Sequence, residues 1–581
     1  MIYLEIARSR VRSKLGPFAL PIGLLGALLL AIGCFLPWST YAGFPGKMLN
    51  STPGGARLYV LLLSLFAVLF LVDWPGRSKA LRGTSLFALI ITVLTMLFVG
   101  YAGGGLVNCG IGVFVALVGA LLYVVGAQAL PEDSAPAPIR NLPDRGWRTL
   151  VETLLVVGAA VSALLVFVIG LGIPTASVAE GPDRRLGGAI SLNDLTNESQ
   201  FLCFLLFVCA AMLGLSRIGL VASLGALTKK HSRVMVAAAL MSAVVFPFTQ
   251  GGDGYSLRIA ASIGVFAAAA IGLNIVVGLA GLLDLGYIAF FGVGAYFAAL
   301  VSGSVTSVLD VDLPFALTIV LAAAISGIFG ILLGAPTLRL RGDYLAIVTL
   351  GFGEIFRITV NNLDGSAGPS LTNGPNGISN IPDLALPGGF SFGDNHTLFG
   401  VDLPFQANYY WLEVILVAVV MTAFLRLAES RIGRAWVAIR EDELAAAATG
   451  INTTRLKLLA FALGATLAGA AGSINAHVVK VAAPDSFTFL ESALLLSAVI
   501  LGGMGTVQGA LLGATVLYLL PEKLRFLQDL RLLVFGIVLV LIMRLRPEGL
   551  VPSKRRQREF REPGGGADAL AAPPGRAEVS T

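Results

Sequence analysis

The stretch AESRIGRAWVAIREDELAAAATGINTTRLK, residues 428–457, separates two apolar blocks and combines dense charge with strong helix formers. Nearly every residue from Ala435 to Ala448 favours a helix, and Gly450 follows where a left-handed C-terminal cap would end it. Because charged side chains are costly in hydrocarbon, we expect the stretch to lie in water or against another protein. A solvated loop helix without a partner is the alternative, and the stretch alone does not decide between them.

The composition around this stretch is that of a membrane protein. Of 581 residues, 56% are hydrophobic and only 13% are charged, and the mean hydropathy is +0.85. These values predict an all-α polytopic membrane protein embedded in a lipid bilayer. The net charge of +6 lies in short links beside apolar runs, so it is interpreted as an orientation signal and no nucleic-acid partner is expected.

Six apolar blocks precede the middle of the chain, and each is long enough to cross a bilayer of about 30 Å. They lie near residues 17–38, 58–74, 85–102, 106–128, 150–173 and 200–222. Basic links at 76–83, 131–148 and 229–233 alternate with links of little or balanced charge at 39–55 and 174–200. By the positive-inside rule the basic links, and therefore the N-terminus, face the cytoplasm.

The second part of the chain is richer in Gly and Ala. Its links continue the same alternation between the cytoplasmic and the outer side of the membrane. Its apolar blocks lie near residues 234–248, 257–279, 285–301, 313–335, 343–360, 411–427, 458–476, 491–519 and 531–546. This alternation places Arg339–Arg341 and the 428–457 stretch inside, and the polar loop 361–408 outside, where it covers a pore mouth, meets a soluble partner or is only a long connector.

The block 491–519 is interrupted by Gly502–Gly505. A single crossing would put the basic residues near the C-terminus outside, against the charge rule, whereas a break into two halves returns them to the cytoplasm. We therefore predict the break. Residues 552–581 are rich in Pro, Gly, Ala and charge and lack apolar periodicity, so they are predicted to be a disordered cytoplasmic tail.

The sequence contains no recognisable catalytic motif. It lacks GxxxxGK[ST], HExxH, DxDxDG and a GxSxG with following Asp and His, so the chain is not predicted to bind ATP through a P-loop or to be an enzyme. Its four cysteines lie inside apolar blocks and its three histidines are scattered. Neither a metal site nor a cofactor is expected, and any energy for transport must come from a partner or an ion gradient.

Two intramembrane segments carry candidates for a translocation path or gate. The Gly-rich segment Ile271–Tyr296 is suited to close helix packing and local unwinding, and its polar exceptions are Asn274 and Asp284. An ionisable residue at membrane depth is a functional candidate, although Asp284 could also lie at a span end in water.

The second such segment is Gly342–Thr359. Glu354 and Arg357 stand three residues apart on one helical face, where they either form an ion pair that orients the helix or act on the substrate path. Thr349 in the same segment offers a hydroxyl group.

Five strings together resemble one family, and they occur in that family's order over residues 234–551. They are GLNIVVGLAGLLDLGYIAFFGVGAY (272–296), LRLRGDYLAIVTLGFGEIFRI (338–358), TNGPNGIS (372–379), IGRAWVAIREDELAAAATGI (432–451) and PDSFTFLESALLLSAVILGGMG (484–505). They are similar to the LivM-type permeases of branched-chain amino-acid ABC transporters.

The resemblance implies a helical importer permease core at 231–551, multi-pass in a bacterial cell membrane with cytoplasmic termini. Its implied partners are a LivH-type permease, two cytoplasmic ATP-binding subunits and an extracytoplasmic solute-binding protein. The 428–457 stretch resembles the loop that couples such permeases to the ATPases. The coupling positions implied in this chain are Arg434, Arg440, Glu441, Asp442, Ala446 and Gly450.

The first 230 residues depart from the family and predict about six extra spans with no role to transfer. Relatives of similar sequence handle urea or short amides, so a permease for those solutes is an alternative. A second alternative is an ion-coupled secondary transporter, for which the intramembrane carboxylates Asp284 and Glu354 are the candidates.

Overall fold

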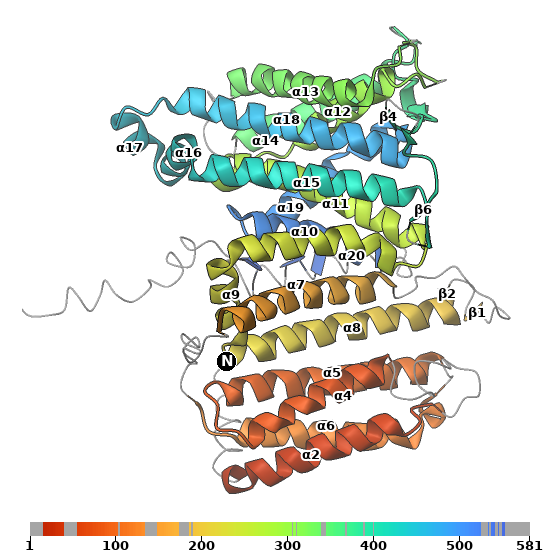
Figure 1. Ribbon diagram of the computed structural model, residues 1–581, viewed down its shortest axis with the longest axis vertical. Coiled ribbons are helices and arrows are strands. Elements are labelled where there is room, and N and C mark those ends of the chain that lie inside the picture. The colour runs from red at the N-terminus through yellow and green to blue at the C-terminus, as the bar shows by residue number, and fades with distance from the viewer. Residues whose placement is uncertain are drawn as a thin grey trace, which may run out of the picture. The chain divides into compact units, whose positions relative to one another are not determined.

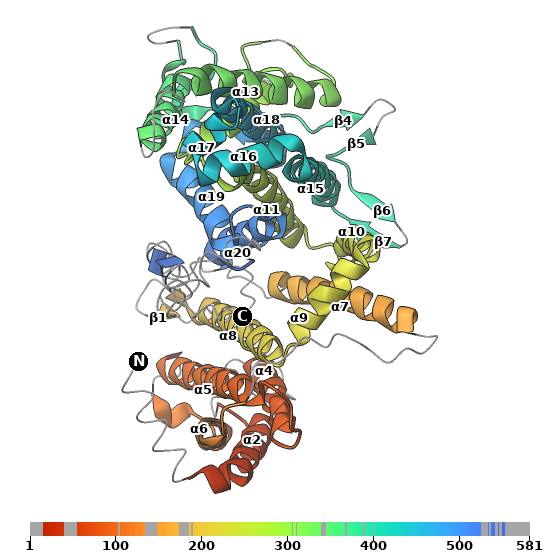
Figure 2. The same ribbon diagram turned by 90° about the vertical axis from the view of Figure 1, so that its left-hand side faces the viewer.

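The computed structural model describes most of the chain (Figures 1 and 2). The described residues are 15–39, 55–102, 105–133, 148–172, 185–186, 190–304, 306–309, 311–337, 344–365, 369–386, 390–398, 400–523, 533, 536–537, 539–540, 544 and 549–551. The predicted tail 552–581 and the basic link Arg339–Arg341 lie outside them.

Helices dominate the described residues. Eleven of them are long and apolar enough to cross a membrane, and the described strands are only two or three residues long. The prediction of an all-α polytopic membrane protein is confirmed. Contacts divide the chain into two units, the first holding Met1–Thr249 with Lys523–Gln528 and the second holding Gln250–Glu522 with Asp529–Thr581.

The first unit has helices at all six predicted N-terminal blocks. Five of these are long and apolar enough to cross a membrane, and the block 58–74 falls on the shorter apolar stretch Ala56–Phe70. Its elements are η1 (Gly16–Phe18), α2 (Ala19–Phe35), α4 (Ala56–Ser64), η2 (Leu65–Phe70), α5 (Arg77–Ala102), η3 (Leu106–Asn108), α6 (Ile111–Ala129), α7 (Arg148–Gly172), β1 (Arg185–Leu186), β2 (Ile190–Ser191), α8 (Leu192–Arg217), α9 (Leu220–Lys230) and α10 (Ser232–Thr249). Helices α2 and α6 touch backbone to backbone, because a Cβ added at Gly26 or Gly119 would overlap the main chain of the other helix.

A buried carboxylate ties α10 and α9 to the first unit. Glu152 of α7 is only 2% exposed and pairs with Lys230 and His231, which join α9 to α10. The contact boundary therefore falls after α10, one helix later than the predicted division at residue 230. The functional division into an N-terminal extension and a permease core remains a prediction.

The second unit is built around α11 and its π-helical continuation. Its helices are α11 (Gly254–Asn274), the π-helix η4 (Ile275–Leu279), α12 (Ile288–Leu300), α13 (Phe315–Thr337), α14 (Tyr344–Asn362), α15 (Gln406–Glu429), α16 (Arg431–Glu441), α17 (Glu443–Ala448), α18 (Thr453–Val479), α19 (Phe489–Gly502) and α20 (Val507–Lys523). In the most apolar part of the α11–η4 span 89% of the residues are buried, against 22% in α15. The reason is that α15, α18 and α19 all pack against α11. Side chains on α11 therefore reach most of the unit.

The predicted break in block 491–519 is confirmed. Helices α19 and α20 are joined by a turn in which Gly503 and Gly505 have φ values of 123° and 77°, the left-handed region that favours glycine. The backbone N–H groups of Leu550 and Val551 donate to the carbonyls of Leu501 and Gly502, each at 2.8 Å. The chain thus returns to the end of the unit where that turn lies, as the charge argument requires.

The predicted outer loop is a packed cap at the other end of the unit. It contains η5 (Gly374–Asn376), β3 (Ile378–Ser379) and two hairpins, β4 (Ala385–Leu386) with β5 (Phe390–Ser391) and β6 (His396–Leu398) with β7 (Val401–Leu403). Strand β3 pairs with β8 (Val481–Ala482), which follows α18 and precedes η6 (Pro484–Phe487). Figure 1 shows α16 and α17 at one end of the unit and β4 and β6 at the opposite end. The 27 residues of α18 separate these ends by about 40 Å.

Glycines bring α12, α18 and α13 into backbone contact. A Cβ added at Gly294 of α12 would overlap the backbone of Gly469 in α18, and Gly469 in turn lies against Ser326 of α13. Ser326 Oγ donates to the carbonyl of Phe290 in α12 at 2.8 Å. These three helices cannot separate to admit a side chain without losing packed area.

Gly294→Val should destabilise the second unit by about 1–3 kcal/mol, because the added side chain forces α12 away from α18. The measurement is the thermal unfolding midpoint and the monodisperse yield of the detergent-solubilised chain. Gly351→Val is the matched control, since nothing lies within 4 Å of a Cβ at that helical glycine. Equal losses in both variants would contradict the packing account.

Candidate coupling site

The 428–457 stretch forms two short helices instead of the single predicted one. The side chain of Asp442 accepts hydrogen bonds from the N–H groups of Leu444 and Ala445, at 2.9 and 3.0 Å, so it caps α17 and stops α16. Aspartate competes with the helix backbone in this way, which helix propensity alone does not register. The prediction for Gly450 is confirmed, because its φ is +87° and it ends α17.

The helix pair is fixed to the start of α18. Trp436 is fully buried, and its indole N–H donates to the carbonyl of Leu456 at 2.7 Å. Lys457, also near the start of α18, forms an ion pair with Glu443 of α17 at 2.6 Å. One face of the pair is therefore folded against the membrane core, and the other face is free for a partner.

The predicted coupling residues divide between these two faces. Arg434, Glu441, Asp442 and Gly450 are exposed. Leu444, which the sequence analysis did not single out, is 72% exposed. Ala446 is 4% exposed and faces inward.

Arg440 points into the core and binds the π-helix. Its Nη1 donates to the carbonyl oxygen of Gly278 in η4 at 2.6 Å. The aliphatic part of the same side chain lies over Gly281, where φ is +72° and an added Cβ would collide with Arg440. The predicted coupling residue is thus the physical link between the helix pair and α11–η4.

Asn274 extends this link to the α19–α20 turn. Its Nδ2 donates to the carbonyl of Thr506 at 2.9 Å, and its Oδ1 accepts from the N–H of Gly505 at 2.8 Å. We call Arg440, Gly278, Asn274, Gly505 and Thr506 the inner junction. It joins three parts of the second unit at the end that carries α16 and α17.

Asp284 and Thr349 lie together in a neighbouring cluster. The hydroxyl of Thr349 accepts from the N–H of Leu285 at 3.0 Å, which pins the connection between η4 and α12 to α14. One carboxylate oxygen of Asp284 accepts from Gly286 N–H at 2.9 Å, and the other has no hydrogen-bond partner in the part of the chain that the structure describes.

Glu354 and Arg357 form the ion pair that their spacing suggested. Arg357 Nε donates to Glu354 Oε1 at 3.0 Å, and both side chains are partly exposed on α14. Arg357 also approaches Asp485 of η6 at 3.9 Å. This pair stands away from the inner junction, toward the capped end of the unit, so the five path candidates do not form a single site.

The sequence analysis missed Glu413. This residue of α15 is 1% exposed, lies against Gly264 of α11, and has no hydrogen-bond partner for either carboxylate oxygen among the described residues. The signal was present, because a carboxylate near the start of an apolar block meets the same criterion that selected Asp284.

Asn274→Leu should destabilise the second unit by about 1–3 kcal/mol, because the Gly505 N–H and the Thr506 carbonyl are left buried without their partner. The measurement is chemical or thermal unfolding of the purified chain in detergent. Asn362→Leu is the control, since that exposed side chain bonds only to its own helix. Unchanged stability in Asn274→Leu would show that the junction bonds contribute little.

Comparison with known proteins assigns the second unit. The family model described as "Branched-chain amino acid transport system / permease component" matches residues 255–543. No solved structure matches the chain.

Named relatives agree with this match. The chain is 41% identical over 338 residues to the LivM high-affinity branched-chain amino acid permease protein of Salmonella typhimurium, covering 56% of this chain and 76% of that protein. It is 39% identical to the Escherichia coli K12 LivM protein with the same coverage. The LivH permease protein of Salmonella typhimurium is 27% identical over 262 residues, covering 43% of this chain and 79% of that protein.

These relatives are transport permease components and not enzymes. The two LivM proteins are more than 30% identical to this chain, which covers 76% of the length of each. The chain therefore belongs to the family of branched-chain amino acid transport system permease components, as a multi-pass membrane protein with a long N-terminal extension.

Proposed function

We propose that this chain is the LivM-type permease subunit of an ATP-driven importer of branched-chain amino acids, and that α16 and α17 receive the movement of separate ATPase subunits. The observation that carries this proposal is the helix pair itself. It presents one free face and is bound to the most buried helix of the unit through Arg440.

The free face has the composition of a protein-docking surface. Leu444 is an exposed apolar side chain between the carboxylates Glu441 and Asp442 and the small residues that follow it. Because charged side chains are costly in hydrocarbon, this face is expected to lie in water. We therefore propose that Leu444 is an anchor for a protein partner and not for lipid. Small neighbours let a partner's backbone approach the anchor closely.

The inner junction supplies a route for that movement. A force on α16 reaches η4 through the Arg440 bond, and reaches the α19–α20 turn through Asn274. Because helices repack between discrete arrangements and do not deform continuously, a shift at this end is expected to rock the spans between inward-open and outward-open states.

The family and the sequence support the proposed energy source and the proposed partner subunits. The chain contains no P-loop motif, so ATP hydrolysis belongs to two separate cytoplasmic subunits. A LivH protein is also similar to this chain, over 43% of its length, which supports a homologous permease as the second membrane subunit. The packed cap at residues 361–408 is the surface offered to an extracytoplasmic amino-acid-binding protein, with both termini cytoplasmic.

Glu441→Arg should reduce ATP-driven leucine uptake about tenfold or more and weaken copurification of the ATPase subunits, because it reverses an exposed charge on the docking face. Uptake is measured in vesicles containing the assembled transporter, and membrane insertion is measured by the amount of chain in the membrane fraction. Normal insertion is expected.

The matched control is Asp394→Arg, a reversal of another exposed carboxylate in the cap at the opposite end of the unit. It should leave the association with the ATPase subunits intact. If Glu441→Arg retained both association and uptake, the docking role of α16 and α17 would be wrong.

A further inference from the structure

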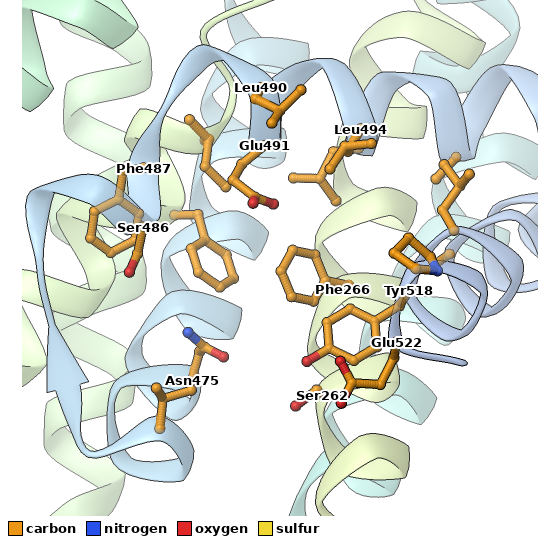
Figure 3. Close-up of a pocket in the computed structure, with 18 of the residues that line it drawn as sticks. Ser262, Phe266, Asn475, Ser486, Phe487, Leu490, Glu491, Leu494, Tyr518 and Glu522 are labelled. Carbon is orange, nitrogen blue, oxygen red and sulfur yellow. The ribbon is translucent and has the colours of Figure 1, made fainter. Parts of the chain in front are cut away.

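A cavity of about 510 Å³ opens near the capped end of the second unit, far from α16 and α17 (Figure 3). Its walls come from α11, the start of α12, the end of α18 with β8, η6, the first three turns of α19 and the last turns of α20. The volume falls within the range of about 300–1,000 Å³ that small-molecule pockets occupy. The cavity is large enough for a small organic solute.

Glu491 places an unsatisfied carboxylate in this cavity. Figure 3 shows its carboxyl group directed into the open space, and no described residue donates a hydrogen bond to it or pairs with it. Glu522, on the facing wall, differs because it accepts from the Tyr255 hydroxyl at 2.8 Å. Glu491 is therefore the carboxylate left for a ligand.

Aromatic and aliphatic side chains form most of the remaining wall. Phe266 and Tyr518 have ring centroids 5.1 Å apart, and Phe291 and Phe487 have centroids 6.3 Å apart. Leu490 and Leu494 continue the apolar surface along α19. A branched aliphatic group would bury its surface among these side chains.

The amide of Asn475 provides a second polar contact. It comes from α18 and lies across the cavity from the α20 residues in Figure 3. An amide N–H₂ is suited to donate to a carboxylate, whereas the acidic side chains around the cavity would repel one. The two ends of a zwitterionic amino acid thus have different partners in this cavity.

We propose that this cavity is the transit site of the permease for an amino acid with an apolar side chain. Glu491 accepts the α-ammonium group, the ring cluster of Phe266, Phe291 and Phe487 receives the side chain, and Asn475 faces the carboxylate. This proposal rests on the proposed function, since it names the solute that the permease would move and where the chain would hold it.

The ammonium group is the feature that the cavity selects. A bond between an ammonium and a carboxylate is stronger than a neutral hydrogen bond, so urea or an amide would gain less from Glu491. An anion would be repelled by Glu491, Glu522 and Asp485. A hydrated inorganic cation would leave the aromatic walls in contact with water.

The test measures occupancy without requiring transport. In the full chain with its four cysteines replaced, Ser486→Cys places one thiol on the cavity wall, and its reaction with a maleimide is followed in membranes of cells that express the whole transporter. Leucine and 3-methylbutylamine, which carry an ammonium group, should slow labelling severalfold. 4-Methylpentanoate and urea should not.

Adding Glu491→Gln should weaken protection by leucine about tenfold or more, because a charged bond becomes a neutral one. Adding Asp73→Asn, which neutralises a carboxylate that is 92% exposed in the first unit, should leave protection intact. Equal protection by 4-methylpentanoate, equal protection by potassium ions, undiminished protection in Glu491→Gln, or no protection by any compound would overturn the assignment.

ATP-driven leucine uptake in the same membranes separates this proposal from the proposed function. Ammonium-dependent protection without ATP-driven uptake supports the cavity assignment while contradicting the importer. Uptake without protection contradicts the cavity assignment and leaves the importer standing.

Discussion

A single hydrogen bond, from the guanidinium of Arg440 to the carbonyl of Gly278, joins the water-exposed part of the second unit to its most buried helix. The bond can form because Gly278 lies at the end of η4, where helix carbonyls lack an intrahelical partner, and because Gly281 has no side chain and so leaves room for the stem of Arg440. Asn274 then extends the connection to the α19–α20 turn. Without this junction, α16 and α17 would be attached to the core only through α15 and α18.

The two ends of the second unit differ in structure, so the unit is asymmetric along its long helices. One end carries exposed charge, short helices and the inner junction, and the other carries the packed cap and the cavity with Glu491. Helix α18 connects them, because Trp436 and Lys457 bind its start and β8 follows its end. A displacement at the charged end therefore has a continuous helical path to the cavity wall at Asn475.

Apolar length and charge placement were sufficient to predict the helical class, five of the six N-terminal spans and the break at Gly502–Gly505, because these depend on transfer free energies and on the conformational freedom of glycine. The division of the coupling stretch at Asp442 was not predicted, since a capping side chain overrides the propensity of its neighbours. The inward orientation of Arg440 was not predicted either. It depends on Gly278, 162 positions earlier in the chain, and spacing within one segment carries no information about such a partner. The cavity at Glu491 was missed for a related reason, because its walls come from several helices. Glu413 differs, because its place in an apolar block met the criterion that selected Asp284.

The most direct test of the account is whether α16 and the α19–α20 turn move together. Spin labels at Arg431→Cys and Gln508→Cys, both exposed positions, report that distance by pulsed electron resonance in the assembled transporter with and without ATP. The account predicts one narrow distance distribution that ATP does not change, and a broadened, ATP-dependent distribution once Arg440→Gln removes the charged donor. A distance that already changes with ATP in the chain with Arg440 intact would contradict the inner junction as the link between the docking face and the core.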